Sequence, residues 1–125
     1  MKGGITFDRA LQIFKSACDA AVVMGTERIL ADFSGAEGDL STLERVELGY
    51  STAEYYLSKR LLFRVAVVGN LPLINGRGAQ VATSRGIAAK TFREHASAVE
   101  WLNHAVRYRL RTRDSIFVVV RHTGA

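Results

Sequence analysis

Residues 62–69 read LFRVAVVG, and this stretch decides the fold class of the chain. Its apolar run, Val65 to Val68, is far too short to span a bilayer. A strand that is apolar without interruption suits a parallel sheet, because such a sheet is covered on both faces and buries both sets of side chains. The stretch therefore predicts a buried strand in a parallel sheet.

Two helices and a strand are expected before this stretch. Thr6 is a favoured N-cap residue and Gly25 a favoured stop, so the first helix is expected between them. A short strand follows at 28–33. STLE at 41–44 has the spacing of a capping box, so the next helix is expected to start there. It is expected to run to about Arg60. The apolar positions of that helix are Leu43, Val46, Leu48, Tyr50, Ala53, Tyr56 and Leu57.

The residues after LFRVAVVG continue the alternation of helix and strand. A loop at 70–78 leads into a short helix that Gly86 ends, and a strand at 87–92 precedes a helix at 93–106. The closing residues, YRLRTRDSIFVVVR at 108–121, alternate around a turn and predict a β-hairpin. The expected fold class is therefore α/β. We expect a mixed sheet of about five strands, three parallel strands plus the hairpin, packed with about four helices.

Length and composition suit a single folded domain over residues 1–125. Residues 1–106 are expected to form its α/β body, and 107–123 the hairpin that completes the sheet, in cis or by swapping between two chains. The one cysteine, Cys18, cannot form an internal disulfide, and no secretory signal pattern opens the chain. We therefore expect a cytoplasmic protein without a membrane span.

The formal net charge is +5, and much of the excess lies in the closing stretch. Alternating arginines keep an edge strand soluble and discourage pairing between edges. A basic strand also suits nucleic acid. We favour edge protection, and binding of nucleic acid through this strand ranks third among the functions considered. The arginines concerned are Arg107, Arg109, Arg111, Arg113 and Arg121.

Four segments occur in order: GITFDRALQIF at 4–14, RILADFSG at 28–35, FRVAVVG at 63–69 and KTFREHASAVEWL at 90–102. Together they resemble the STAS superfamily, the anti-sigma-factor-antagonist-like domains, and in particular its SpoIIAA-like (STAS/SEC14-like) bacterial branch. Domains of this type normally begin with a β-hairpin, which this chain has at its end instead. The resemblance therefore implies a circularly permuted member whose hairpin pairs beside 28–33. It also implies a non-catalytic regulatory module that acts through protein contacts.

In the regulatory branch of the superfamily, a strand leads through a loop to a phosphorylatable Ser or Thr that opens the next helix. The matching residues here are Ser34, Ser41 and Thr42, with Arg45 further along, and they form the predicted partner or phosphorylation surface. The Asp-Ser-Ser-Gly signature of that branch is absent, so Ser41 is favoured as an N-cap alone. A protein partner is expected. A homodimer, with or without a swapped hairpin, stays open.

A carrier of a small apolar or anionic ligand is the alternative function. Tyr56 and Phe63 would line its pocket, as the SEC14-like branch implies, and Asn75 and Arg77 lie in a glycine-containing loop that suits an anion. The sequence has no recognisable catalytic constellation, metal-ligand spacing or cofactor fingerprint. We therefore expect no enzyme activity, metal or cofactor.

Overall fold

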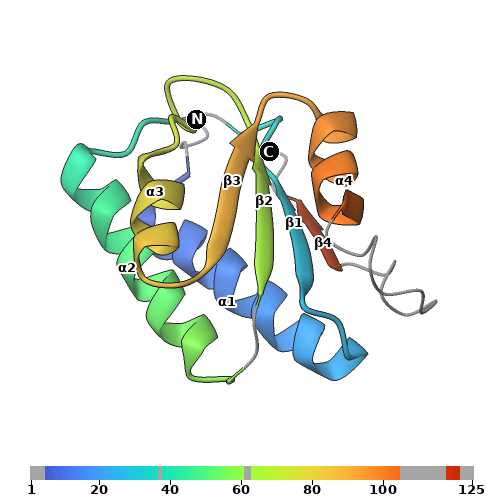
Figure 1. Ribbon diagram of the computed structural model, residues 1–125. Helices are drawn as coiled ribbons and strands as arrows, with labels where there is room; N and C mark the ends of the chain where they lie inside the picture. The colour runs from blue at the N-terminus through green and yellow to red at the C-terminus, as the bar shows by residue number, and fades with distance from the viewer. Residues whose placement is uncertain (1–4, 37, 61–62, 105–117, 122–125) are drawn as a thin grey trace.

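The computed structural model describes residues 5–36, 38–60, 63–104 and 118–121. In these residues four helices alternate with four strands (Figure 1). In chain order they are α1 (Phe7–Met24), β1 (Arg28–Asp32), α2 (Thr42–Leu57), β2 (Arg64–Val68), α3 (Arg77–Ser84), β3 (Ala88–Phe92), α4 (His95–His104) and β4 (Val118–Arg121).

The described strands form one sheet in the order β3-β2-β1-β4, and every neighbouring pair is parallel. β2, the strand predicted from LFRVAVVG, lies inside the sheet between β3 and β1. The carboxyl ends of the strands therefore share one edge of the sheet, at the top of Figure 1. The predicted α/β class with parallel strands is confirmed.

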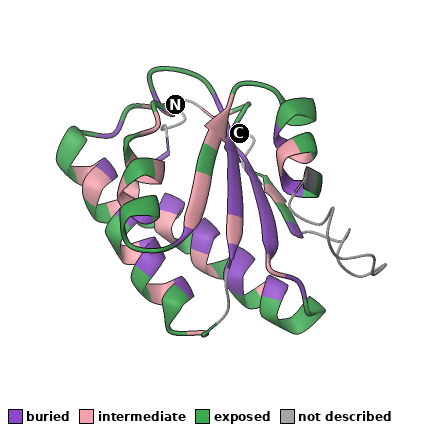
Figure 2. Cartoon of the chain, viewed as in Figure 1, coloured by how far each residue is buried: buried purple, intermediate pink, exposed green. Residues whose placement is uncertain are grey.

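Helices cover both faces of the sheet, as the uninterrupted apolar strands require. Ile29 of β1 faces the larger core, which α1, α2 and α3 complete. Leu30, its neighbour, faces a smaller core that includes Ala98 and Leu102 of α4. Figure 2 shows the result as buried β1 and β2 between two helical layers, while β3 at the edge is half-buried.

The closing strand, β4, lies beside β1, where the hairpin was expected to pair. β4 pairs in parallel with β1 of the same chain, from Ile29 beside Val118 to Asp32 beside Arg121. The other strand of the predicted hairpin, at 107–113, lies outside the described residues. The described residues therefore form four strands, all parallel, and the expected mixed sheet of five strands is not confirmed.

The predicted starts of the first two helices and the predicted end of the first are confirmed. The Thr6 side chain accepts a hydrogen bond from the Arg9 amide at 3.2 Å, and Gly25 ends α1 with a φ of 74°. Ser41 and Glu44 form both bonds of the capping box, at 2.9 and 3.0 Å. α2 ends at Leu57, three residues before the predicted end, because a turn follows it.

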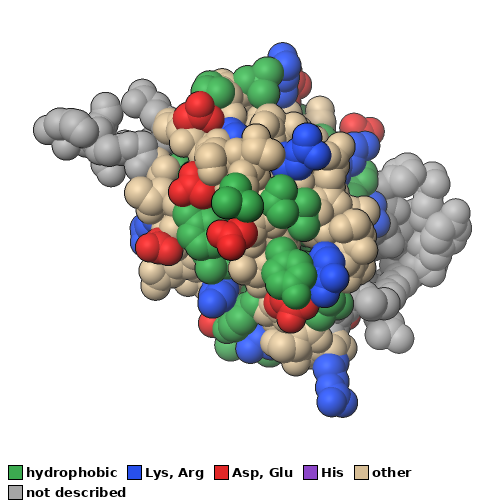
Figure 3. Space-filling model, turned by 90° about the vertical axis from the view of Figure 1, so that its left-hand side faces the viewer, with side chains coloured by type: hydrophobic (Ala, Val, Ile, Leu, Met, Phe, Trp, Pro, Cys, Tyr) green, Lys and Arg blue, Asp and Glu red, His purple; other side chains and the backbone are tan. Residues whose placement is uncertain are grey.

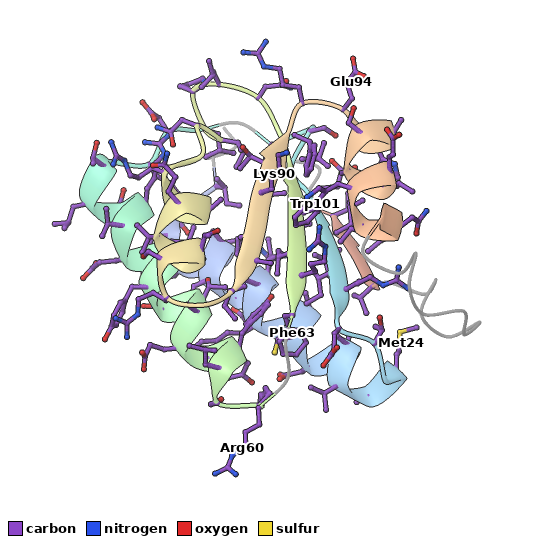
Figure 4. The ribbon with its side chains drawn as sticks, viewed as in Figure 1. Met24, Arg60, Phe63, Lys90, Glu94 and Trp101 are labelled. Carbon is purple, nitrogen blue, oxygen red and sulfur yellow. The ribbon has the colours of Figure 1, made fainter. Side chains whose placement is uncertain are left out.

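The larger core contains the residues that are most fully enclosed. The Tyr56 hydroxyl donates to the Phe14 carbonyl oxygen at 2.6 Å, and the Tyr56 ring meets Phe63 edge-on at 5.0 Å. Figure 4 shows Phe63 at the base of the sheet, while Arg60 points away from it. Cys18 is also buried, and burial is the main cause that raises the pKa of its thiol to about 11. Its sulfur is therefore a core atom and not a reactive thiolate.

None of the helices that the structure describes is long and apolar enough to cross a membrane.

Candidate functional site

Helix α2 carries apolar side chains on two different faces. One face packs on the sheet and on the neighbouring helices, and its buried residues are Arg45, Gly49, Thr52, Ala53 and Tyr56. The other face points to solvent: Leu43 is 69% exposed, Tyr50 46% and Leu57 38%. These three residues are seven positions apart, so they form one stripe along the helix. None of the three residues belongs to a buried core cluster.

Acidic side chains alternate with this stripe. Glu47 and Glu54 are exposed between its apolar members, and we call Leu43, Glu47, Tyr50, Glu54 and Leu57 together the α2 face. Figure 3 looks onto this side of the molecule, where hydrophobic and acidic side chains intermingle, with Lys and Arg side chains among them. An apolar row with charged flanks is the pattern by which one helix packs against another.

Arg85, which follows α3, holds two members of the α2 face in place. Its guanidinium lies 4.6 Å from the centre of the Tyr50 ring, and Nη2 is 3.0 Å from Oε2 of Glu54. A stacked and paired arginine restricts the rotamers of both partners, so less side-chain entropy is lost when a protein docks on them.

The predicted partner residues at the start of α2 are exposed. Ser41 and Thr42 directly precede Leu43, so they adjoin the α2 face. The Ser41 hydroxyl serves as the N-cap of α2, because it accepts a hydrogen bond from the Glu44 amide. Ser34 is exposed at the end of β1, where its amide donates to Oδ1 of Asp32 at 2.9 Å.

Arg45 does not belong to that surface, because its side chain is buried beneath the loops that precede α2 and α3. Its guanidinium donates to the carbonyl oxygens of Leu40, Pro72 and Leu73 and to the carboxylate of Asp39. The expected surface role is replaced by a structural one. An arginine has donors pointing in several directions, which allows one side chain to join two loops.

The residues predicted to line a ligand pocket are not brought together. Tyr56 and Phe63 pack against each other in the core, and burial raises the pKa of Tyr56 well above its usual value. Asn75 and Arg77 are exposed in and after the β2–α3 loop, where the Arg77 amide donates to Oδ1 of Asn75. Asn75 lines an open depression of about 350 Å³ with Gly69, Leu71, Ile74, Thr91, Phe92 and Arg93.

A buried carboxylate lies at the carboxyl edge of the sheet. Oδ2 of Asp32 is 3.4 Å from Nε of Arg121, which ends the neighbouring strand. Burial by itself raises the pKa of Asp32, but hydrogen bonds from Ser34 and the charges of Arg121 and His95 outweigh it and leave the pKa below its usual value. The other arginines of the predicted basic strand lie outside the described residues. Arg121 is engaged within the fold.

Asp32→Asn is expected to reduce the amount by which the free energy of unfolding falls at low pH. Because the pKa of Asp32 is lower in the folded protein, its ionised form stabilises the fold above about pH 4, and this contribution is lost as the pH falls through the folded pKa. Urea unfolding at a series of pH values should therefore give a shallower loss of stability at low pH for the variant. Glu100→Gln removes a charge at an exposed position of α4 and should keep the wild-type slope. Equal slopes for Asp32→Asn and the wild type would contradict the assignment.

The sequence analysis named Leu43, Tyr50 and Leu57 among the apolar positions of α2 but did not single them out as an exposed row. The signal that separates them is the spacing: Leu43, Tyr50 and Leu57 repeat every seven residues, on a different side of the helix from Ala53 and Tyr56. Among the residues with described positions, no three His, Cys, Asp or Glu side chains gather in a way that would hold a metal ion. Comparison with protein-family models, with curated proteins and with solved structures finds no match.

Proposed function

We propose that this protein is a non-catalytic, regulatory protein-binding module and that the α2 face is its contact surface. The observation that carries the proposal is the exposed row of Leu43, Tyr50 and Leu57 on a helix whose opposite side is buried. Isolated exposed apolar residues are common on protein surfaces, whereas a regular row with charged flanks is typical of an interaction site.

The charge of the α2 face selects the kind of partner. The chain as a whole has a formal net charge of +5, yet the apolar row is flanked by Glu47 and by Glu54, the second of which Arg85 partly neutralises. A partner with complementary chemistry is an amphipathic helix that presents apolar side chains beside Lys or Arg. A second copy of α2 in antiparallel register would set glutamates against glutamates. We therefore infer a different protein as the partner.

The resemblance to the STAS superfamily forms part of this proposal. A permuted member needs its last strand in parallel beside the first, and the pairing of β4 with β1 in one chain supports that arrangement. The exposed Ser41 and Thr42, at the start of the α2 face, fit a regulatory role. A phosphate there would add negative charge beside Leu43 and strengthen attraction for a basic partner.

A pair of synthetic helices tests the contact surface and its charge preference. Both carry leucine at the core positions of three heptads; one has lysine at the flanking positions and the other glutamate. The lysine peptide is expected to bind, as measured by fluorescence anisotropy at physiological salt. Tyr50→Asp should weaken that binding by at least about tenfold, since it places a charge in the middle of the apolar row.

Leu71→Asp is the matched control, because Leu71 is also an exposed apolar residue and lies outside α2. It makes the same change in charge and should leave the affinity of the lysine peptide unchanged. The proposal is wrong if both peptides bind alike, or if Tyr50→Asp and Leu71→Asp have the same effect on binding.

A further inference from the structure

Strand β3 lies at one end of the described sheet, and no described strand pairs with its outer side. Its inner side faces β2, where the carbonyl oxygen of Phe92 accepts a hydrogen bond from the Gly69 amide at 2.9 Å. The backbone groups of successive residues in a strand point to opposite sides, so the amides and carbonyls of Ala89 and Thr91 point outward. Figure 1 shows β3 at the front of the sheet, with α3 on one side of it and α4 on the other.

The side chain of Thr83, from α3, occupies only the first part of this outer side. Its hydroxyl donates to the Ala89 carbonyl oxygen at 3.0 Å and accepts a hydrogen bond from the Ala89 amide at 3.4 Å. None of the described groups bonds to the outward amide and carbonyl of Thr91. Because an unpaired amide and carbonyl at a sheet edge are a template for a further strand, the free part of the edge begins at Thr91.

Two open depressions lie along the outer side of β3, and Thr91 lines both of them. The first, of about 430 Å³, lies between β3 and α3 and is lined by Ala79, Thr83 and Ala89 among others. The second, of about 350 Å³, continues past the carboxyl end of β3 to Arg93. The depressions provide room for the side chains of a strand that pairs with β3. We call the outer side of β3 together with these two depressions the β3 groove.

The charged side chains that line the β3 groove are all basic, among the residues that the structure describes. They are Lys90 and Arg93; both are exposed, and neither forms an ion pair within the described part of the chain. Charge complementarity therefore favours a partner that carries carboxylates. A second copy of this chain is disfavoured, because pairing of two β3 edges would bring the same cations together.

The backbone of Thr91 selects a peptide over a nucleic acid. Its outward side presents a donor and an acceptor next to each other, and a peptide in the extended conformation has both groups to match them. The phosphate oxygens of a nucleic acid only accept hydrogen bonds, so they would leave the carbonyl oxygen of Thr91 unpaired.

We propose that the β3 groove binds an extended acidic segment of another protein, which adds to the sheet as a strand beside β3. Residues of the segment that pair with Thr91 turn their side chains toward α3, into the depressions. The alternate residues turn toward the opposite face, where Nζ of Lys90 lies 5.6 Å from the centre of the Phe92 ring. Acidic side chains at these alternate positions meet Lys90. The β3 groove is separate from the α2 face, and this proposal holds whether or not a helix docks there.

Four synthetic peptides test the proposal. The parent peptide alternates valine and glutamate over about nine residues, and the second has lysine in place of every glutamate. In the third and fourth, either the central valines or the central glutamates are N-methylated. N-methylation removes amide hydrogens from one edge of the strand and keeps the charge of the peptide, so these two peptides separate backbone pairing from electrostatic attraction.

The parent peptide is expected to bind at physiological salt, as measured by fluorescence anisotropy, and to shift the amide NMR signals of β3 and α3. The lysine peptide should not bind. N-methylation of the valines should weaken binding by at least about tenfold, because their amides face β3. N-methylation of the glutamates should change the affinity by less than about twofold, because their amides point away from β3.

Substitutions in the protein locate the binding site. Lys90→Glu should weaken binding of the parent peptide by about tenfold. Arg60→Glu makes the same change in charge at an exposed residue that points away from the sheet, and it should leave the affinity unchanged. Tyr50→Asp, in the α2 face, should also leave it unchanged, which keeps this result independent of the proposed helix-binding surface. Circular dichroism reports whether each variant keeps the fold.

Four outcomes would overturn the proposal: no binding of the parent peptide, equal binding of the parent and lysine peptides, equal losses for the two N-methylated peptides, and equal effects of Lys90→Glu and Arg60→Glu. Single-stranded DNA is tested as a competitor of the parent peptide. If it binds at β3 as tightly as the peptide does, the groove recognises negative charge alone and the proposal is wrong.

Discussion

Replacing Arg45 with methionine is expected to lower the free energy of unfolding by about 3–5 kcal/mol. The methionine side chain fills a similar volume but donates no hydrogen bond. The carbonyl oxygens of Leu40, Pro72 and Leu73 would lose their donor, in a place where the arginine side chain is only 9% exposed. The loop before α2 and the loop before α3 would also lose the side chain that joins them.

Chemical denaturation monitored by circular dichroism measures this effect. Arg77→Met is the control, since it removes the same charge from an exposed arginine at the start of α3 and should change stability by less than about 0.5 kcal/mol. A loss of less than about 1 kcal/mol for Arg45→Met would mean that water replaces the guanidinium at the three carbonyl groups.

The second large effect is expected at Gly49: Gly49→Val should lower the free energy of unfolding by about 3 kcal/mol. A Cβ atom at this position would overlap the carbonyl oxygen of Gly78 and come within 2.9 Å of Cβ of Val81. The obstacle includes backbone, so α3 itself has to move away. Helix propensity alone predicts the opposite sign, because glycine is a poorer helix former than valine.

Glu47→Val, two residues earlier in the same helix, introduces the same residue at an exposed position. It should alter the unfolding free energy by no more than about 0.5 kcal/mol. Comparison of the two unfolding midpoints separates the contact with α3 from any general effect of valine in α2. An increase in stability for Gly49→Val would contradict this prediction, because it would show that α3 can move away from α2 without a loss of stability.

Helix α2 thus combines two roles on two sides. The buried side holds Arg45 and packs against α3, and the outward side carries the α2 face. Substitutions on the outward side are expected to change binding without changing the fold. Arg45 cannot serve as a surface probe, because its replacement removes the support of two loops.

Local signals in the sequence predicted most of the elements. Thr6, Gly25 and Ser41 act on the nearest backbone groups, so the helix ends that they predict need no knowledge of distant residues. The uninterrupted apolar run of β2 required cover on both faces, and this placed it inside a parallel sheet.

Contacts between distant segments decided the rest. Whether an arginine such as Arg45 is solvated or buried depends on the carbonyl groups that meet it, and Pro72 and Leu73 are far from it in the sequence. The same holds for the α2 face: α2 has more apolar residues than one buried side can take, and only the positions of the sheet and α3 determine which of them stay outside.

The sequence by itself therefore determined the α/β class, the order of the described elements, the starts of the first two helices and the end of α1, because these follow from neighbouring residues and from hydrophobic periodicity. The tertiary structure alone decided the buried position of Arg45 and the exposure of the α2 face. Each of these depends on which side chains meet across the packed layers, and that is a property of the assembled fold and not of any single segment.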